Sequence, residues 1–208
     1  MSALVSLIVP VRDAASAKSR LAAGGGVDAD ARRASLAAAI ALDTVGAARA
    51  AREVGELIVV GSLAEPLEGV RLVDDPGYGL LVAIGAGLAA ADPAAPTAVL
   101  LGDLPALQPA DLDAALVAAS EHHWAFVPDA EGTGTTFVVA AAGLPHSLRF
   151  GDDSAEQHRD AGYVELPVRE HSGLRRDVDT LEQLTGLADL AAAGVVLLGP
   201  RTRALLET

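Results

Sequence analysis

The chain has 208 residues, of which 51% are hydrophobic and only 3% aromatic, so its core must be built mainly from Ala, Val, Leu and Ile. Its net charge of −13 has no compensating block of Lys or Arg, which excludes nucleic acid and anionic membrane surfaces as partners. The absence of Cys excludes disulfides and thiolate metal sites.

This composition and length indicate one domain over residues 1–208. Aliphatic residues without many aromatics are typical of helices packed on a parallel sheet, so we expect the α/β class with a mainly parallel central sheet flanked by helices. The first eleven residues lack a basic region and are not followed by a cleavage pattern, so we expect a cytoplasmic protein without a signal peptide or membrane span.

The first predicted strand, residues 4–11, leads into a loop of small residues that carries Arg12, Lys18 and Arg20 and ends in three glycines. Backbone N–H groups and cations in such a loop can surround a polyphosphate together. The P-loop pattern is absent from it. A surface loop with solvated charges is the alternative.

A long helix is predicted from about residue 29 to residue 53, with Asp28 as its cap, and strands are predicted at 57–60 and 70–73. Strands and helices that alternate in this way form βαβ units, which produce a mainly parallel sheet. The sequence therefore supports the α/β class a second time.

The helix predicted to begin near Leu80 contains the spacing GxGxxA at Gly85, Gly87 and Ala90, which is also found in dinucleotide-binding proteins. In those proteins the glycines lie at a turn between a strand and a helix, whereas here they lie inside a predicted helix. We therefore favour close packing of small residues, with a dinucleotide-dependent oxidoreductase as the alternative.

The apolar run at 98–101 predicts a central strand, and Gly102 and Asp103 follow it directly. Ligands of open α/β sheets bind beyond the carboxyl ends of the strands, where Asp103 would lie, and Gly102 allows close approach of the backbone. Asp103 is therefore the first candidate for a metal ligand. The alternative is a cap for the helix predicted at 109–121.

A further strand is predicted at 124–127, followed by the sequence DAEGTGTTF at 129–137. Its glycines free the backbone and its threonines, Thr135 among them, offer hydroxyl groups, which suits the binding of a carboxylate or phosphate. A plain hairpin turn is an equal alternative.

The segment 148–159 reads LRFGDDSAEQHR, in which Ser154 is predicted to cap a short helix that contains His158. The unpaired N–H groups at the start of that helix would form an anion site, and Arg149 and Arg159 would add positive charge.

In the sequence RRDVDT at 175–180, the spacing of two places Asp177 and Asp179 on one side of an extended segment, from which they could meet Asp103. A solvated turn in which Arg175 and Arg176 form ion pairs is the alternative. Together, the carboxylates, the basic loop and the anion-suited loops indicate Mg²⁺-assisted chemistry on phosphates.

Five motifs in the same order, namely KSRL at 18–21, GDLPAL at 102–107, GTGT at 132–135, RFGDDS at 149–154 and GLRRDVDT at 173–180, resemble the guanylyltransferases of coenzyme F420 biosynthesis. That family includes 2-phospho-L-lactate and phosphoenolpyruvate guanylyltransferases. The resemblance implies a single Rossmann-like nucleotidyltransferase domain that joins GTP to a three-carbon phosphoacid and releases pyrophosphate. It also implies that the product passes to the next transferase of the pathway.

The resemblance further implies roles for individual residues. Asp103, with Asp177 or Asp179, would bind Mg²⁺, and Asp103, Lys18 and Arg20 would be the catalytic residues. The nucleotide-binding residues would be Pro10, Arg12, Lys18, Arg20 and Gly79. The residues that receive the phosphoacid would be Thr135, Arg149, Gly151, Ser154 and His158.

The sequence departs from the family pattern at Arg12, where a Lys is usual, at Leu81, where an Asn is usual, and at Leu181, where a Pro is usual. The change at Leu81 motivates one alternative, a non-catalytic protein that binds a nucleotide. A related Mg²⁺-dependent transferase that acts on a sugar phosphate or a molybdenum cofactor is the other. The choice among phosphoenolpyruvate, 2-phospho-L-lactate and 3-phosphoglycerate is left open.

Overall fold

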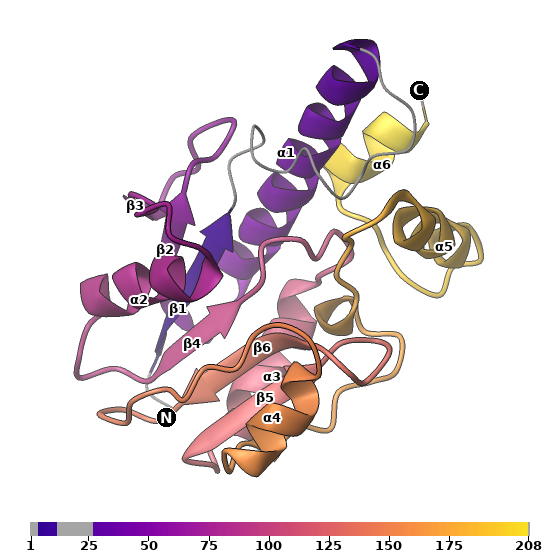
Figure 1. Cartoon of the computed structure of the whole chain (residues 1–208). Helices are drawn as coiled ribbons and strands as arrows, with labels where there is room; N and C mark the ends of the chain where they lie inside the picture. Colours follow the sequence, from indigo (N-terminus) through magenta and orange to yellow (C-terminus); the bar gives the residue numbers. More distant parts are fainter. Residues whose placement is uncertain (1–3, 12–26, 208) are drawn as a thin grey trace.

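Seven strands form one sheet in a computed structural model, which describes residues 4–11 and 27–207 (Figure 1). Their order across the sheet is β3-β2-β1-β4-β6-β5-β7. The strands are β1 (Val5–Val11), β2 (Val54–Gly61), β3 (Arg71–Val73), β4 (Thr97–Leu100), β5 (Trp124–Pro128), β6 (Thr135–Ala140) and β7 (Val164–Glu165).

The sheet is mainly parallel, as the sequence predicts. β1 pairs in parallel with both β2 and β4, so that Ile8 lies opposite Ile58 on one side and Val99 on the other. β6 is antiparallel to both of its neighbours, β4 and β5. Because β1 and β4 are buried on both faces, their sequences are continuous apolar runs rather than alternating ones.

Helices cover both faces of the sheet. They are α1 (Val27–Ala50), α2 (Leu80–Ala90), α3 (Pro109–Ala119), α4 (Ser154–Asp160), the 3₁₀-helix η2 (Gly173–Arg175), α5 (Leu181–Ala192) and α6 (Pro200–Leu206). On one face, Val45 of α1 and Leu112 of α3 pack in a core with β1, β2 and β4. On the other face, Ile84 of α2 and Ala155 of α4 pack against Ile8 and Phe126.

The ends of α1 differ from the prediction. The helix begins at Val27, so Asp28 lies within it and is not its cap. It ends at Ala50 rather than near residue 53, because the carboxylate of Asp113 accepts hydrogen bonds from the N–H groups of Arg52 and Glu53 at 2.7 and 3.0 Å. A residue of α3 therefore helps to fix where the connection to β2 begins.

The GxGxxA spacing lies inside α2, so the packing interpretation is confirmed. A Cβ atom on Gly87 would lie 2.5 Å from Cγ2 of Ile8 and 2.8 Å from Cγ2 of Val60. The glycine is therefore needed for close contact between α2 and the sheet, and the structure gives no support to a dinucleotide site there. No helix within residues 4–11 and 27–207 has both the length and the apolar character to cross a membrane.

Candidate active site

A pocket of about 400 Å³ lies at the carboxyl ends of β1 and β4. A Cβ atom on Gly102 would lie 2.7 Å from the carbonyl oxygen of Pro10, so the glycine allows the chain after β4 to approach β1, as predicted. This approach leaves Asp103 in the wall of the pocket. A main-chain hydrogen bond from Val178 to Asp103 brings the segment with Asp177 and Asp179 into the same wall.

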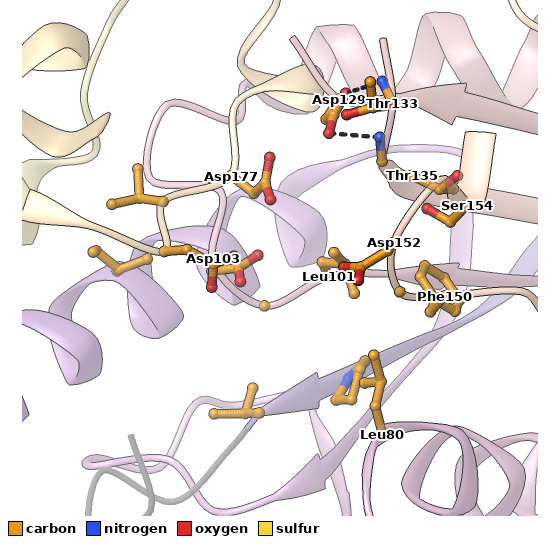
Figure 2. A pocket seen from close by; sticks show the side chains of 18 of the residues that line it. Leu80, Leu101, Asp103, Asp129, Thr133, Thr135, Phe150, Asp152, Ser154 and Asp177 are labelled. Atoms are coloured by element: carbon orange, nitrogen blue, oxygen red, sulfur yellow. Dashed lines mark hydrogen bonds between the residues drawn. The ribbon is translucent and has the colours of Figure 1, made fainter. Parts of the chain in front are cut away.

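Figure 2 shows that the pocket has two chemically different ends. Asp103 and Asp177 lie at one end, whereas Thr135, Ser154 and Phe150 lie at the other, with the carboxylate of Asp152 beside them. The described residues of the lining include no Lys or Arg, and its acidic members are Asp103, Asp129, Asp152, Asp153, Asp177 and Asp179. An anionic ligand can enter such a pocket only if cations accompany it or lie beside it.

The acidic end favours a bound cation. Burial raises the pKa of Asp177 to about 6, and the nearby charges of Asp129, Asp179 and Glu131 also raise it. Hydrogen bonding to its own backbone lowers it. A divalent cation would relieve this repulsion. In the part of the chain that the structure describes, no three acidic or histidine side chains are grouped closely enough to hold a metal ion by themselves. One or two carboxylates with water and phosphate oxygens suffice for Mg²⁺, and this donor set fits that requirement.

In the hairpin between β5 and β6, two N–H groups are already paired with a carboxylate of the same hairpin. The carboxylate of Asp129 accepts hydrogen bonds from the N–H groups of Thr133 and Gly134 at 2.9 and 2.7 Å, which Figure 2 shows as dashed lines. An internal carboxylate therefore occupies these two donors, so of the groups expected to hold an anion the hydroxyl groups are the ones left to do so. The segment is a hairpin between two antiparallel strands.

The start of α4 is also occupied. Ser154 is the first residue of the helix, and the residue that precedes it, Asp153, adopts a left-handed conformation with φ of 53°. The N–H of Ser154 donates to Gly151, and that of Ala155 donates to the carbonyl of Thr133 at 2.9 Å. The predicted capping role of Ser154 is therefore wrong, and two of the N–H groups expected to form an anion site at the helix N-terminus are already paired. Ser154 instead lines the pocket beside Thr135.

Arg175 holds the acidic segment against the hairpin. Its guanidinium donates to the main-chain carbonyl of Asp129 at 3.1 and 2.7 Å. Arg176 likewise donates to a carbonyl, that of Glu170, at 3.3 Å. Both arginines therefore bind backbone oxygens, and the alternative of an ion-pair turn with Asp177 and Asp179 is not what the structure shows.

Comparison with known proteins places this chain in a family. Residues 38–192 match the MobA-like NTP transferase domain. The chain is 41% identical over 210 residues to the phosphoenolpyruvate guanylyltransferase of Streptosporangium roseum, covering 97% of this chain and 90% of that protein. It is 43% identical over 211 residues to the phosphoenolpyruvate guanylyltransferase of Thermomonospora curvata, covering 96% of this chain and 87% of that one. The chain belongs to the phosphoenolpyruvate guanylyltransferase family.

This family membership makes the chain a nucleotidyltransferase, as the motifs predicted. Its fold is shared with a solved structure from Desulfovibrio desulfuricans G20 that is described as a nucleotide-diphospho-sugar transferase. The two superpose with a TM-score of 0.70 over 100% of this chain and 95% of the other, at 18% identity. At that identity the likeness shows the fold alone.

Not every residue assigned from the guanylyltransferase motifs lies in the pocket. Pro10, Gly151 and Ser154 line it with Thr135 and the three aspartates. His158 is fully buried behind this lining, and the exposed side chain of Arg149 turns back to donate to the carbonyl of Leu148. Neither of these two residues lines the pocket.

The remaining residues are those that the guanylyltransferase motifs assign to nucleotide binding. Arg12, Lys18 and Arg20 lie outside the described residues. Gly79 precedes α2 with φ of 94°, a conformation that favours glycine, and it directly precedes Leu80, which lines the pocket. Leu81 is 48% exposed and does not line the pocket.

Sequence reasoning missed Asp129 and Phe150 as parts of the site. Asp129 directly follows β5, and because β5 runs parallel to β4 through their shared antiparallel neighbour, its carboxyl end reaches the same edge as Asp103. The rule that selected Asp103 could therefore have selected Asp129 as well. Phe150 carries no local signal, since its place in the lining depends on how the segment before α4 folds back.

Proposed function

We propose that this chain transfers GMP from GTP to phosphoenolpyruvate and releases pyrophosphate. One observation carries the proposal: a single pocket has carboxylates suited to a cation at one end and two hydroxyl side chains at the other. Such a pocket suits a triphosphate with its metal ion beside a small acid. The names of the relatives in Streptosporangium and Thermomonospora support phosphoenolpyruvate as that acid.

In the proposed reaction, a phosphate oxygen of phosphoenolpyruvate attacks the α-phosphorus of GTP. A new P–O bond forms, the bond from the α-phosphorus to the oxygen that bridges to the β-phosphorus breaks, and pyrophosphate leaves with the electron pair. The attacking phosphate is already ionised near neutral pH, so the chain needs no general base. Positioning and electrostatics therefore supply the rate enhancement.

Asp103, with Asp177 or Asp179, would hold Mg²⁺, which when bound neutralises charge on the triphosphate. Thr135 and Ser154 would bind the phosphoacid at the other end, beside Gly151. Lys18 and Arg20 would hold the triphosphate, with Pro10, Arg12 and Gly79 around the nucleotide. These assignments place the acceptor phosphate between the acidic end and the hydroxyl end.

The test measures pyrophosphate release with each of GTP, ATP, CTP and UTP and each of phosphoenolpyruvate, 2-phospho-L-lactate and 3-phosphoglycerate, with Mg²⁺ present. We expect turnover with GTP and phosphoenolpyruvate and a product mass equal to their GMP conjugate. Adding the next transferase of the F420 pathway and its deazaflavin acceptor would remove an unstable product. Turnover only with 2-phospho-L-lactate or 3-phosphoglycerate would overturn the choice of acceptor.

If GTP binds without turnover on any acceptor, the chain is a nucleotide-binding protein rather than an enzyme. Leu81→Asn would then be the first variant to examine, because it restores the residue usual in the family. Recovery of activity in that variant would identify this single departure as the cause.

A further inference from the structure

His158, which follows the RFGDDS motif, lies behind the pocket, and other side chains surround its ring. His158 is 0% exposed. Its ring is stacked on that of Phe126, with centroids 5.8 Å apart, and meets Phe150 and Tyr163 edge-on at 5.7 and 5.1 Å. The orientation of the imidazole is therefore fixed by packing.

Both ring nitrogens have hydrogen-bond partners of different chemistry. The main-chain N–H of Arg149 donates to Nε2 at 3.1 Å, whereas Nδ1 lies 3.0 Å from Oγ1 of Thr135. A backbone N–H can only donate, so Nε2 must be an acceptor and carries no hydrogen. In a neutral imidazole the hydrogen is then on Nδ1.

The ring is neutral at physiological pH. Burial lowers the pKa of His158 to about 4, and the charge of Arg149 also lowers it. Hydrogen bonding to the backbone of Ser154 raises it. A neutral ring with its hydrogen on Nδ1 can donate to Thr135 as well as to the backbone of Ser154, so in the contact with Nδ1 the Thr135 oxygen can only accept. The hydroxyl hydrogen of Thr135 is then not used in this contact, and Thr135 lines the pocket.

We propose that His158 is a positioning residue whose Nδ1–H holds the Thr135 hydroxyl as a hydrogen-bond donor toward the pocket, where it selects an anionic oxygen of the acceptor substrate. This inference rests on the proposed function for the identity of that substrate, a phosphoacid. A threonine without this partner could equally turn its lone pairs toward the pocket and repel the anion. The histidine therefore acts on specificity without touching the ligand.

The same ring also aligns two segments of the site. By accepting from Arg149, His158 joins the segment that carries Phe150 and Gly151 to β6, which carries Thr135. The hydrogen bond from Ala155 to Thr133 makes a second connection between these parts of the chain. The hydroxyl end of the pocket is thus assembled around one buried histidine.

His146 provides a matched control within the same chain. It is also a largely buried histidine whose pKa burial lowers to about 4, and its Nε2 lies 3.1 Å from Oγ1 of Thr97. Its Nδ1 lies 3.2 Å from the hydroxyl of Tyr163. Neither Thr97 nor His146 lines the pocket, and His146 is connected to the His158 ring through Tyr163, so changes there should lower stability with little effect on substrate binding.

The first test reads the tautomer directly in the unmodified protein. Two-bond ¹⁵N–¹H NMR correlations distinguish an Nδ1–H imidazole from an Nε2–H one, and the spectrum of His158→Gln identifies the signals of His158. We expect the neutral Nδ1–H form between pH 6 and 8. An Nε2–H form would overturn the proposal. This readout needs no substrate, so it stands whether or not the proposed reaction is found.

The second test compares two variants, each of which can keep one of the two hydrogen bonds that the His158 ring makes with Thr135 and Arg149. His158→Asn can retain a donor amide near the Nδ1 position, whereas His158→Gln can retain an acceptor near the Nε2 position only. We expect His158→Gln to raise the KM for phosphoenolpyruvate roughly 10-fold or more, the size of a lost hydrogen bond to a charged group, and His158→Asn to raise it less. The KM for GTP should stay unchanged in both.

His146→Gln is the control, and we expect it to lower the melting temperature without changing either KM. Equal KM increases for GTP and phosphoenolpyruvate in both His158 variants would reduce the histidine to a structural role and overturn the proposal. If the unmodified enzyme does not turn over, the proposed function fails. The same variants are then compared by calorimetric binding of phosphoenolpyruvate, and the tautomer decides the positioning role.

Discussion

The main-chain N–H of Val178 donates a hydrogen bond of 3.0 Å to the carbonyl oxygen of Asp103. Val178 lies between Asp177 and Asp179, so this bond fixes both carboxylates relative to the loop after β4. The side chain of Val178 is buried against α1 and α5, which prevents the segment from moving away. The acidic end of the pocket is therefore assembled by a backbone contact between distant parts of the sequence.

The first prediction concerns Asp103. Asp103→Ala should lower the rate of turnover by a factor on the order of 10²–10³ or more, the size seen when one electrostatic contact to a transition state is removed. The melting temperature should change little, because the carbonyl that binds Val178 remains. Pyrophosphate release and thermal unfolding measure the two effects, with the exposed Glu121→Gln as the control. Full activity in Asp103→Ala would contradict its role in holding a metal ion.

Removal of divalent metal tests the same end of the pocket without mutation. Asp103, Asp177 and Asp179 all line the pocket, so a triphosphate beside these carboxylates would need a cation to accompany it. We expect a chelator to abolish pyrophosphate release and added Mg²⁺ to restore it. Calorimetry should also show weaker binding of GTP in the chelated protein. Undiminished turnover after chelation would refute the assignment of Mg²⁺.

Gly85 and Gly87 of α2 are a matched pair of positions for measuring the free energy of unfolding. Gly87→Ala would place a Cβ 2.5 Å from Ile8 and 2.8 Å from Val60, so we expect a loss of about 1–3 kcal/mol in the free energy of unfolding. A Cβ on Gly85 meets nothing within 4 Å, so Gly85→Ala should gain about 0.5–1 kcal/mol through helix propensity. Urea unfolding measures both, and equal effects would show that packing does not distinguish them.

Asp43 of α1 stabilises the C-terminal helix. Its carboxylate accepts hydrogen bonds from the N–H groups of Arg201 and Thr202, at 3.2 and 2.7 Å, at the start of α6. Asp43→Ala should cost about 2 kcal/mol, because it leaves these buried donors without an acceptor. Asp43→Asn, which keeps one acceptor oxygen, should cost less. Hydrogen exchange should be faster at 200–206 in the Ala variant, and unchanged exchange there would contradict this role.

Acid should destabilise the protein through its buried histidines. Burial lowers the pKa of His146 and of His158 to about 4, so between about pH 6.5 and pH 4 the unfolded chain binds protons that the folded chain does not. The free energy of unfolding should therefore fall as the pH decreases through this range, by up to roughly 3 kcal/mol for each histidine. Below about pH 4 this contribution is fully lost.

Asp177 opposes this loss, because burial raises its pKa to about 6 and the folded chain therefore binds its proton first. Urea unfolding at several pH values between 7 and 4 measures the net effect. Asp177→Asn removes the opposing contribution, so its stability should fall more steeply with acid than that of the unmodified protein. A stability that rises from pH 6.5 to pH 4 in Asp177→Asn would be inconsistent with neutral buried histidines.

The sequence determined the class of the fold and indicated the edge of the sheet where the pocket lies. Apolar runs such as 98–101 identify buried parallel strands, because burial on both faces removes the alternation of polar residues. Asp103 could be selected since the carboxyl end of such a strand is where ligands bind. The order of five short motifs then indicated the family, which comparison with known proteins confirmed.

The tertiary structure decided which polar groups remain available to a ligand. Sequence patterns are local and show which donors a loop contains, but a distant residue determines whether those donors are already paired. Asp129 occupies the N–H groups of the hairpin, Thr133 occupies that of Ala155, and Asp113 ends α1 early. For the same reason only the packed structure shows that His158 lies behind Thr135 rather than in the pocket.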